Sequence, residues 1–326
     1  MLIIRSNTSN PAFNLATEEF LMNHKQDNWF YLYINDPSII VGKFQNSLAE
    51  INVEYVNKNN IIVIRRMSGG GAVFHDPGNL NFTFIMTDQQ DKTVDFRKYT
   101  QPILDVLRSL DVDAKFEGRN DMTIKGKKFS GNAKLYYNDK VLQHGTLLFN
   151  STLPNLTQAL KLNPLKYRDK SVKSISSRVT NISEHLTNDI TLEEFESRII
   201  KHVSNMYDDS KVYELTDSDI EAINQLVEEK YGTWDWNFGH SPEYNFQKGI
   251  KTDGGHVEVN LDVKKGEIKN VKIFGDFFST QGVSELEKLL IGTPHEQEKI
   301  KELLTTVGLE NYISNVTVDE LLEGMF

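Results

Sequence analysis

A run of glycines behind a pair of arginines is the feature of this chain best suited to bind an anion. Arg65 and Arg66 end the β-branched run Ile61-Ile62-Val63-Ile64, and Ser68-Gly69-Gly70-Gly71 follows them closely. Glycines let backbone N–H groups approach a ligand, successive N–H groups bind phosphate oxygens, and arginine adds a planar fork of donors. The order matches neither a Walker loop nor a dinucleotide-binding fingerprint, because Ala72-Val73-Phe74 is typical of a strand. A tight turn whose arginines face water is the alternative.

Further residues that could carry chemistry lie in three motifs downstream. They are Gly118-Arg119-Asn120-Asp121, Lys127-Lys128-Phe129-Ser130-Gly131-Asn132-Ala133 and Gln143-His144-Gly145-Thr146. A positioned ammonium stabilises charge that develops on phosphorus, and a carboxylate beside phosphates commonly holds Mg²⁺. The alternatives are a solvated lysine run and an Asx-turn at Asp121. On a strand, His144 is typical of a core residue, although the neighbouring glycine permits close approach of a ligand.

Taken in order, these motifs resemble those of bacterial lipoate–protein ligases of the A type. The matching patterns are Arg-Arg-x-Ser-Gly-Gly-Gly-Ala-Val-Phe-His-Asp, Gly-Arg-Asn-Asp, Lys-x-Ser-Gly-x-Ala and His-Gly-Thr-Leu-Leu. The resemblance continues through Ser177-Arg178-Val179-Thr180-Asn181 and Trp234-Asp235-Trp236-Asn237-Phe238-Gly239, so it covers essentially the whole chain. It implies an enzyme that activates lipoate with ATP to lipoyl-AMP and transfers the lipoyl group to a lysine of a carrier protein.

The resemblance also implies cofactors, partners and site residues. ATP and Mg²⁺ are the implied cofactors, octanoate is an alternative to lipoate, and the carriers are apo lipoyl domains of 2-oxoacid dehydrogenase E2 subunits or the glycine-cleavage H protein. Lys128 is the implied catalytic residue, with Lys127 as its competitor, and Asp121 is the implied Mg²⁺ ligand. The residues implied to bind ATP or lipoyl-AMP are Arg66, Ser68, Gly70, Gly71, Ala72, Val73, Phe74, Asn120, Asp121, Gly131, Ala133, His144 and Arg178.

Two neighbours of the arginine–glycine motif are given structural roles. Arg65 is expected to support the loop, while Arg66 contacts phosphate. His75, followed by Asp76-Pro77-Gly78, is interpreted as a histidine before a turn, because adjacent side chains on a strand point to opposite faces and do not form a dyad.

Composition restricts the class of protein independently. The 326 residues exceed the roughly 250–300 at which one core stops growing, so two domains are expected. The absence of cysteine excludes disulfides, thiolate metal sites and a cysteine nucleophile. A net charge of −10 argues against a general nucleic-acid binder. No apolar run approaches a membrane span and the first residues do not resemble a signal peptide, which predicts a cytoplasmic protein. We expect a monomer.

The predicted order of elements places the motifs on a sheet. A helix is expected over residues 11–22, with Asn10 as its N-cap and Pro11 at its first position. Strands are then predicted at 30–34, 38–42, 61–65, 72–75 and 79–86, and a helix at 99–110. Short strands fill residues 114–150, with a hairpin turn at 137–140. Helices are predicted at 153–162, 192–207 and 218–231.

The remainder of the chain predicts a second, smaller domain. Gly239, Pro242 and Gly249 interrupt the pattern between residues 237 and 252, and clean alternation over His256–Val263 followed by a turn and a return strand then predicts a hairpin. Helices are expected at 284–290, 294–307 and 318–323. The fold class is therefore predicted as α+β: a mixed-sheet catalytic domain of the biotin/lipoate ligase type over residues 1–246, and a small α+β accessory domain over 247–326.

A basic segment lies between these parts. Residues 161–178 carry six basic side chains against Asp169, and the segment corresponds in the resembling family to a loop that closes over the adenylate. We expect it to be mobile without ligand, and to help receive an acidic carrier.

Three alternatives to a ligase remain. An octanoyl- or lipoyl-transferase of the same fold works through a cysteine thioester, which this chain lacks a residue to form. A biotin ligase has a different order of arginine and glycine in its motif. A non-catalytic carrier-binding module would keep the fold without needing Lys128.

Overall fold

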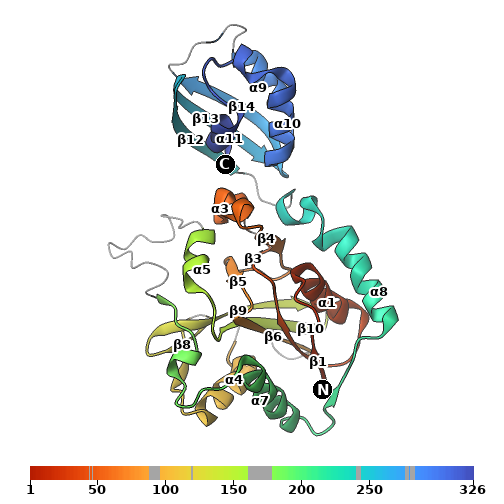
Figure 1. Cartoon of the computed structure of the whole chain (residues 1–326). Helices are drawn as coiled ribbons and strands as arrows, with labels where there is room; N and C mark the ends of the chain where they lie inside the picture. The colour runs from red at the N-terminus through yellow and green to blue at the C-terminus, as the bar shows by residue number, and fades with distance from the viewer. Residues whose placement is uncertain are drawn as a thin grey trace. The chain divides into compact units, whose positions relative to one another are not determined.

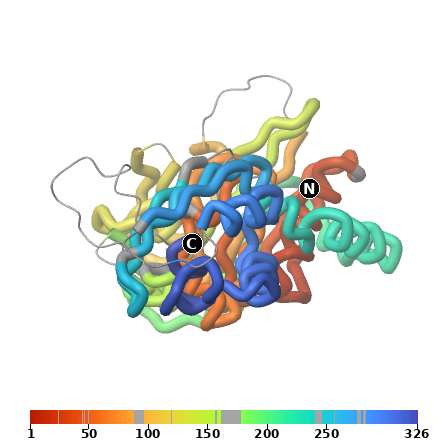
Figure 2. Tube along the Cα trace, turned by 90° about the horizontal axis from the view of Figure 1, so that it is seen from above, coloured from red at the N-terminus to blue at the C-terminus, as the bar shows by residue number. Residues whose placement is uncertain are grey.

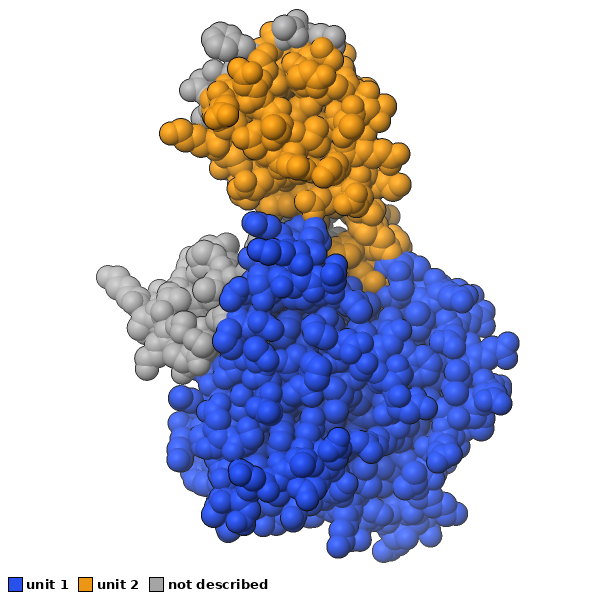
Figure 3. All heavy atoms as spheres, in the orientation of Figure 1, with its two compact units in different colours: residues 1–43, 50–233 blue, residues 44–49, 234–326 orange. Residues whose placement is uncertain are grey.

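The computed structural model describes residues 1–43, 45, 47–87, 96–118, 120–160, 178–239, 244–275, 279 and 283–326. It divides into two compact units, the first made of residues 1–43 and 50–233 and the second of residues 44–49 and 234–326 (Figure 3). The division therefore falls between Thr233 and Trp234, earlier than the expected boundary after residue 246. The reason is that the aromatic segment beginning at Trp234 packs with the hairpin of the second unit, where its ring lies against Gly266.

An eight-stranded sheet forms the centre of the first unit. Its spatial order is β11(Lys211–Val212), β1(Leu2–Arg5), β2(Trp29–Ile34), β6(Asn79–Thr87), β10(Lys140–Leu148), β9(Lys127–Tyr137), β8(Asp121–Ile124) and β7(Ala114–Glu117). Strand β1 runs parallel to β11 and β2, whereas the other neighbours are antiparallel. The mixed sheet is thus confirmed. So is the turn between β9 and β10, where Asn138 takes a φ of 54°.

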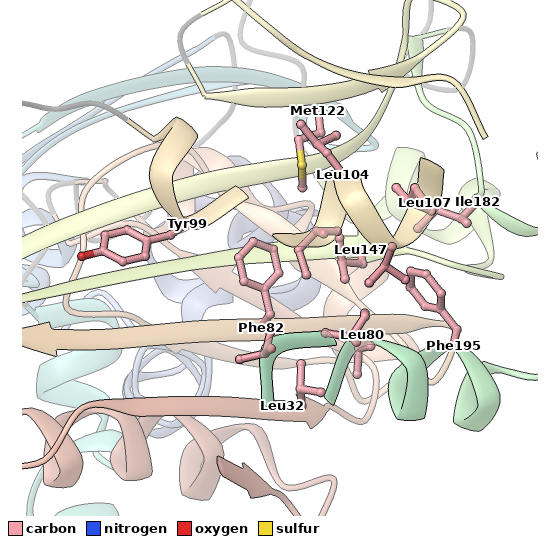
Figure 4. Close-up of a cluster of buried hydrophobic side chains, with 14 of the residues drawn as sticks. Leu32, Leu80, Phe82, Tyr99, Leu104, Leu107, Met122, Leu147, Ile182 and Phe195 are labelled. Atoms are coloured by element: carbon pink, nitrogen blue, oxygen red, sulfur yellow. The ribbon is translucent and has the colours of Figure 1, made fainter. Parts of the chain in front are cut away.

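One face of this sheet is covered by α4(Arg97–Ser109) and α7(Leu192–Asn205) (Figure 1). Alternation along β6 and β10 sends every second side chain to this face, and these side chains form one buried apolar cluster with the two helices. Figure 4 labels members of that cluster: Leu32, Leu80, Phe82, Tyr99, Leu104, Leu107, Met122, Leu147, Ile182 and Phe195.

The opposite face of the sheet carries polar side chains and α1(Pro11–His24). The predicted N-cap is confirmed, since Asn10 Oδ1 accepts from the backbone N–H groups of Ala12 and Phe13. Helix α8(Asp217–Leu226) and the turn η3(Val227–Tyr231) run beside α1 (Figures 1 and 2). They are tied to it by Glu19, whose carboxylate accepts from Lys230 at 2.6 Å and from the Tyr231 hydroxyl at 2.7 Å.

A separate three-stranded sheet lies in the first unit, in the order β4(Ile62–Arg65), β3(Ser38–Val41), β5(Val73–His75). Each strand was predicted, but their separation from the large sheet was not. Two short helices of the same unit accompany it, α3(Val53–Lys58) and α5(Leu153–Ala159), whereas α2(Ser47–Glu50) belongs mostly to the second unit. The polar face of the large sheet and this small sheet are joined by side-chain hydrogen bonds, and the candidate site is built between them.

The second unit is a three-stranded antiparallel sheet, β12(Tyr244–Thr252), β13(Gly255–Lys264) and β14(Glu267–Gly275), packed on α9(Val283–Leu290), α10(Gln297–Val307) and α11(Val318–Met325). Its apolar core is its own, as an independent domain requires. The interpretation of residues 237–252 as interrupted structure was wrong, because β12 occupies 244–252 and pairs with β13 along its whole length. Gly249 is accommodated within that strand.

The remaining short turns are η2(Ser183–His185), η4(Asp235–Gly239) and η5(Leu309–Asn311). Among the described residues, no helix is both long and apolar enough to cross a membrane.

Candidate functional site

A β-bulge decides which way Lys128 points. Asp121 pairs with Gly131 and Met122 with Ser130, but Thr123 then pairs with Lys128, so Phe129 is an extra residue in β9. Paired residues share a face, and a bulge shifts the alternation by one. Lys128 therefore lies on the same face as Gly131 and Asp121, whereas regular alternation would have placed Lys127 there.

The ammonium of Lys128 is held in place by two neighbours. Its Nζ lies 2.8 Å from Oδ1 of Asp121, in an ion pair whose two side chains are both more than a third exposed. A Cβ on Gly131 would lie 2.8 Å from the same Nζ, so the lysine side chain passes over the glycine, and a larger residue there would shift its ammonium. The Lys128 carbonyl also accepts from the N–H of Thr180, which brings the Arg178–Thr180 segment beside β9.

The glycine loop is shaped by both arginines. Arg66 uses its donors inside the protein: Nε binds Ser68 Oγ at 3.0 Å, Nη1 binds the Ile40 carbonyl at 3.0 Å, and Nη2 binds the carbonyls of Gly69 and Gly71 at 2.7 and 2.8 Å. Burial lowers the pKa of Arg66 to about 10, which leaves it charged at neutral pH. Arg66 thus supports the loop from within, a role that the sequence had given to Arg65 alone, and its contact with phosphate stays a prediction.

Arg65 supports the adjoining segment. Its Nη1 binds the carbonyls of Gly42 and Lys43 at 3.0 and 3.1 Å, and the N–H of Lys43 in turn donates to the carbonyl of Ser68. Gly70 has a φ of 94°, a left-handed conformation that glycine adopts without strain.

A buried chain of hydrogen bonds connects the loop to α1. Ser68 Oγ lies 2.6 Å from Nε2 of His144, and the other ring nitrogen, Nδ1, lies 2.9 Å from Oε2 of Glu18. Because an ionised carboxylate only accepts, Nδ1 donates to it. The hydroxyls of Tyr33 and Thr83 also donate to Glu18. The carboxylate on α1 is therefore linked through His144 and Ser68 to the Arg66 guanidinium.

This connectivity has the order of a serine–histidine–carboxylate triad, yet it is not placed to act as one. Ser68 is fully buried, it does not line the pocket, and its Oγ already accepts from Arg66. A nucleophile needs its oxygen exposed to the substrate carbonyl. We interpret the chain as a brace that fixes the glycine loop.

A pocket of about 110 Å³ lies between the small sheet and the polar face of the large one and opens to solvent. Its apolar wall is formed by Leu15, Ile40 and Val73, and polar groups gather at Lys128 and the glycine loop. The predicted residues that line it are Arg66, Gly70, Gly71, Ala72, Val73, Asn120, Lys128, Gly131, Ala133 and His144.

The remaining predicted residues do not line the pocket. Asp121 contacts Lys128, and Ser68 contacts Arg66 and His144, all three of which are lining residues. Phe74 does not line the pocket, contrary to the prediction. Its side chain is 3% exposed, because alternation along β5 turns it to the face opposite Val73 and His75, which line the pocket. Arg178 stands next to the bridge between Val179 and Lys128. Residues 161–177 of the basic segment lie outside the described residues.

Sequence reasoning missed part of the site. The additional lining residues are Leu15, Tyr33, Ile40, His75, Asn81, Asn132, Gly145 and Thr146. Those on α1, β2 and β3 carry no motif, and nothing local signals that their strands meet. For Gly145 a signal existed, since a glycine in a strand marks a close approach. His75 is followed by the predicted turn at Pro77 and Gly78, and it also lines the pocket.

Metal binding has little support from the protein side chains alone. In the part of the chain that the structure describes, no three His, Cys, Asp or Glu side chains are grouped so as to hold a metal ion. Asp121, the predicted Mg²⁺ ligand, pairs with Lys128.

Gly42 allows a direct test of the loop's packing. A Cβ there would lie 2.0 Å from the carbonyl oxygen of Gly70, a backbone atom, whereas a Cβ on Gly71 meets nothing within 4 Å. We expect Gly42→Ala to lower the free energy of unfolding by about 1–3 kcal/mol, as overpacking does. Gly71→Ala is the matched control and should change it by less than about 0.5 kcal/mol. Equal urea midpoints for the two variants would show that the loop does not depend on this contact.

Family models match both parts of the chain. Residues 10–204 match the lipoyl protein ligase A/B catalytic domain, and residues 241–325 match the C-terminus of bacterial lipoate protein ligase. A curated relative, lipoate-protein ligase LplJ of Bacillus subtilis (strain 168), is 44% identical over the full length of both chains. The chain therefore belongs to the lipoate–protein ligase family, a family of enzymes.

Solved structures agree with this assignment. LipL1 of P. falciparum, solved in complex with lipoate, is 27% identical, with a TM-score of 0.64 over 99% of this chain and 98% of that one. A bipartite lipoate protein ligase of Thermoplasma acidophilum, described together with its E2 lipoyl domain, is 30% identical, with a TM-score of 0.64 over 74% of this chain and 97% of that one.

Proposed function

We propose that this protein activates lipoate with ATP and transfers the lipoyl group to a carrier lysine. In the first step a lipoate carboxylate oxygen attacks the α-phosphorus of ATP, the bond to the β-phosphate oxygen breaks, and pyrophosphate leaves. In the second step the carrier's lysine nitrogen attacks the lipoyl carbonyl, loses a proton, and AMP leaves. Lipoyl-AMP is the shared intermediate.

The position of Lys128 is the observation that carries the proposal. Lys128 lines the same pocket as Gly70 and Gly71, and its ammonium is paired with Asp121 and passes over Gly131. Charge develops on the α-phosphate oxygens in the first step, and a positioned cation stabilises it without reorganisation. The glycine loop offers backbone N–H groups to the same phosphate.

The apolar wall supports lipoate as the acid. Leu15, Ile40 and Val73 give an acyl chain a surface free of charge, and the acid's carboxylate then faces Lys128. The P. falciparum relative of this fold was solved with lipoate bound. Octanoate, with a chain of the same length, is proposed as a second substrate.

The residues present fit Mg²⁺ in a limited way. This ion keeps several waters and is commonly held by one or two carboxylates together with substrate phosphates. Asp121 stands beside Lys128 and is the carboxylate proposed to take that part. The ion would neutralise phosphate charge when ATP is bound.

Apo lipoyl domains of E2 subunits are the proposed carriers, and the glycine-cleavage H protein is a further one. The Thermoplasma ligase described with its E2 lipoyl domain supports the first of these. We also propose that the protein acts as a cytoplasmic monomer, with the first unit carrying both chemical steps and the second unit accessory to them.

The test is whether transfer depends on ATP. A thioester transferase needs a cysteine nucleophile, which this chain lacks. We expect lipoylation of an apo lipoyl domain only with ATP and Mg²⁺, together with lipoate-dependent exchange of pyrophosphate into ATP, and we expect thiol-alkylating reagents to leave both unaffected. The measurement is carrier mass by mass spectrometry beside the exchange rate. Nucleotide-free transfer of octanoyl from an acyl-carrier-protein thioester would overturn the proposal.

A further inference from the structure

A buried amide chain fixes the protonation of His75. The Nδ2 of Asn14 is identified by the carbonyls of Thr8 and Ile34, which only accept, and it donates to Asn35 Oδ1 at 2.8 Å. The Nδ2 of Asn35 must then face Nδ1 of His75, which lies 3.0 Å away. Since an amide nitrogen only donates, Nδ1 is the acceptor and the ring proton is on Nε2.

That Nε2–H is a donor without an acceptor. His75 is 3% exposed and lines the pocket, and its Nε2 is buried with no hydrogen-bond partner among the described residues. Ser38 pairs with His75 across β3 and β5, is fully buried, and its Oγ has no partner in the same part of the chain. Buried polar groups are paired in the great majority of cases, so the unpaired Nε2–H of His75 at the pocket wall points to a ligand.

The position of His75 along the pocket shows which part of a ligand it meets. Ile40 pairs with Val73, and Ser38 pairs with His75 on the next rung of the same face. Gly71 in the glycine loop and His75 are four residues apart, at most about 13 Å if the chain between them is extended. An extended lipoate chain is of similar length.

We propose that Nε2–H of His75 donates a hydrogen bond to a sulfur of the dithiolane ring and so distinguishes lipoate from octanoate. The inference rests on the proposed function and adds a specificity-determining residue to it. The ring sulfurs are the only heteroatoms of lipoate outside its carboxylate, and divalent sulfur accepts hydrogen bonds weakly.

The electrostatic environment keeps this donor neutral. Burial above all, and then the nearby side chains of Arg66 and His144, lower the pKa of His75 to about 3. The ring is therefore uncharged in the working pH range, and it suits an uncharged acceptor rather than a phosphate or carboxylate.

The experiment compares lipoate with two acids that lack its ring sulfurs. The exchange of pyrophosphate into ATP is measured with the full chain and one acid at a time. The acids are lipoate, octanoate and 5-cyclopentylpentanoate, in which a carbon ring replaces the disulfide ring. We expect the unmodified protein to favour lipoate over the carbon ring by about fivefold in kcat/KM, as one weak hydrogen bond allows. His75→Phe should abolish that preference, lowering kcat/KM for lipoate by about fivefold more than for the carbon-ring acid.

Two further variants separate the effect of the hydrogen-bond donor at His75 from the effect of the shape of the pocket wall. His75→Gln keeps an N–H near the position of Nε2 and should restore part of the preference, whereas Val73→Ala enlarges the same wall and should weaken all three acids alike. Equal losses for lipoate and the carbon-ring acid in His75→Phe would overturn the inference. If that variant does not fold, equal kcat/KM for the two ring acids in the unmodified protein overturns it as well. Absence of exchange with every acid would instead refute the proposed function.

Discussion

Replacement of Lys128 by alanine is expected to lower the rate of lipoyl-AMP formation by about 10²-fold or more, the effect of removing one preorganised electrostatic donor. The protein should still fold, because the Lys128–Asp121 pair is more than a third exposed on both sides and contributes little to stability. The measurement is single-turnover pyrophosphate release, with the urea midpoint recorded for each variant.

Lys127→Ala is the matched control for this prediction. Lys127 is exposed, and it pairs with Ile124 on the face turned away from Gly131. It should lose less than about twofold in rate, since an exposed side chain outside the pocket makes no contact that strengthens in the transition state. A larger loss for Lys127→Ala than for Lys128→Ala would mean that the bulge at Phe129 does not orient the site.

Replacement of Glu18 by alanine should have the largest effect on stability. The carboxylate is 2% exposed and accepts from His144, Tyr33 and Thr83. Its loss leaves three buried donors unpaired and removes the anion linked to Arg66. Breaking a buried charged network by removing one partner costs about 3–5 kcal/mol, so we expect the free energy of unfolding in urea to fall by that amount.

Two further variants on helix α1 test whether the loss of stability comes from removing the buried carboxylate. Glu18→Gln keeps an acceptor for the two hydroxyls and should lose about 1–2 kcal/mol, because only the contact to His144 must rearrange. Asn23→Ala removes an exposed side chain of α1 and should change stability by less than about 0.5 kcal/mol. If Glu18→Ala is no less stable than Asn23→Ala, the buried chain does not hold the loop.

The helices and strands could largely be predicted because their signals are local. The Asn10 cap, the strand ending at Arg65 and the turn at Asn138 each follow from residues within a few positions. Strand partners could not be predicted. Three short apolar strands look alike whether they join a large sheet or form their own, and β12 lost its alternation around Lys248 and Gly249, so a paired strand resembled a linker.

The candidate site was predictable only where a motif marked it. Lys128 and the glycines were identified through the family resemblance, whereas Glu18 and Asn35 lie in a helix and a strand end with nothing to distinguish them. Phe74 was predicted to line the pocket and His75 was not, whereas the structure shows the opposite. The sequence does not show which face of β5 turns to the pocket, and that face is set by the pairing of Ile39 with Phe74.

The bulge at Phe129 determines which of two neighbouring lysines, Lys127 or Lys128, faces the pocket. Phe129 is fully buried in the apolar cluster of the first unit. If β9 slipped into regular register, Phe129 would turn into the pocket, Lys128 into the core, and Lys127 would take the place beside Asp121. Exposing a phenylalanine alone costs about 1.5–3 kcal/mol, and burying a lysine adds to it. The hydrophobic effect acting on one aromatic ring thus selects which lysine can serve the reaction.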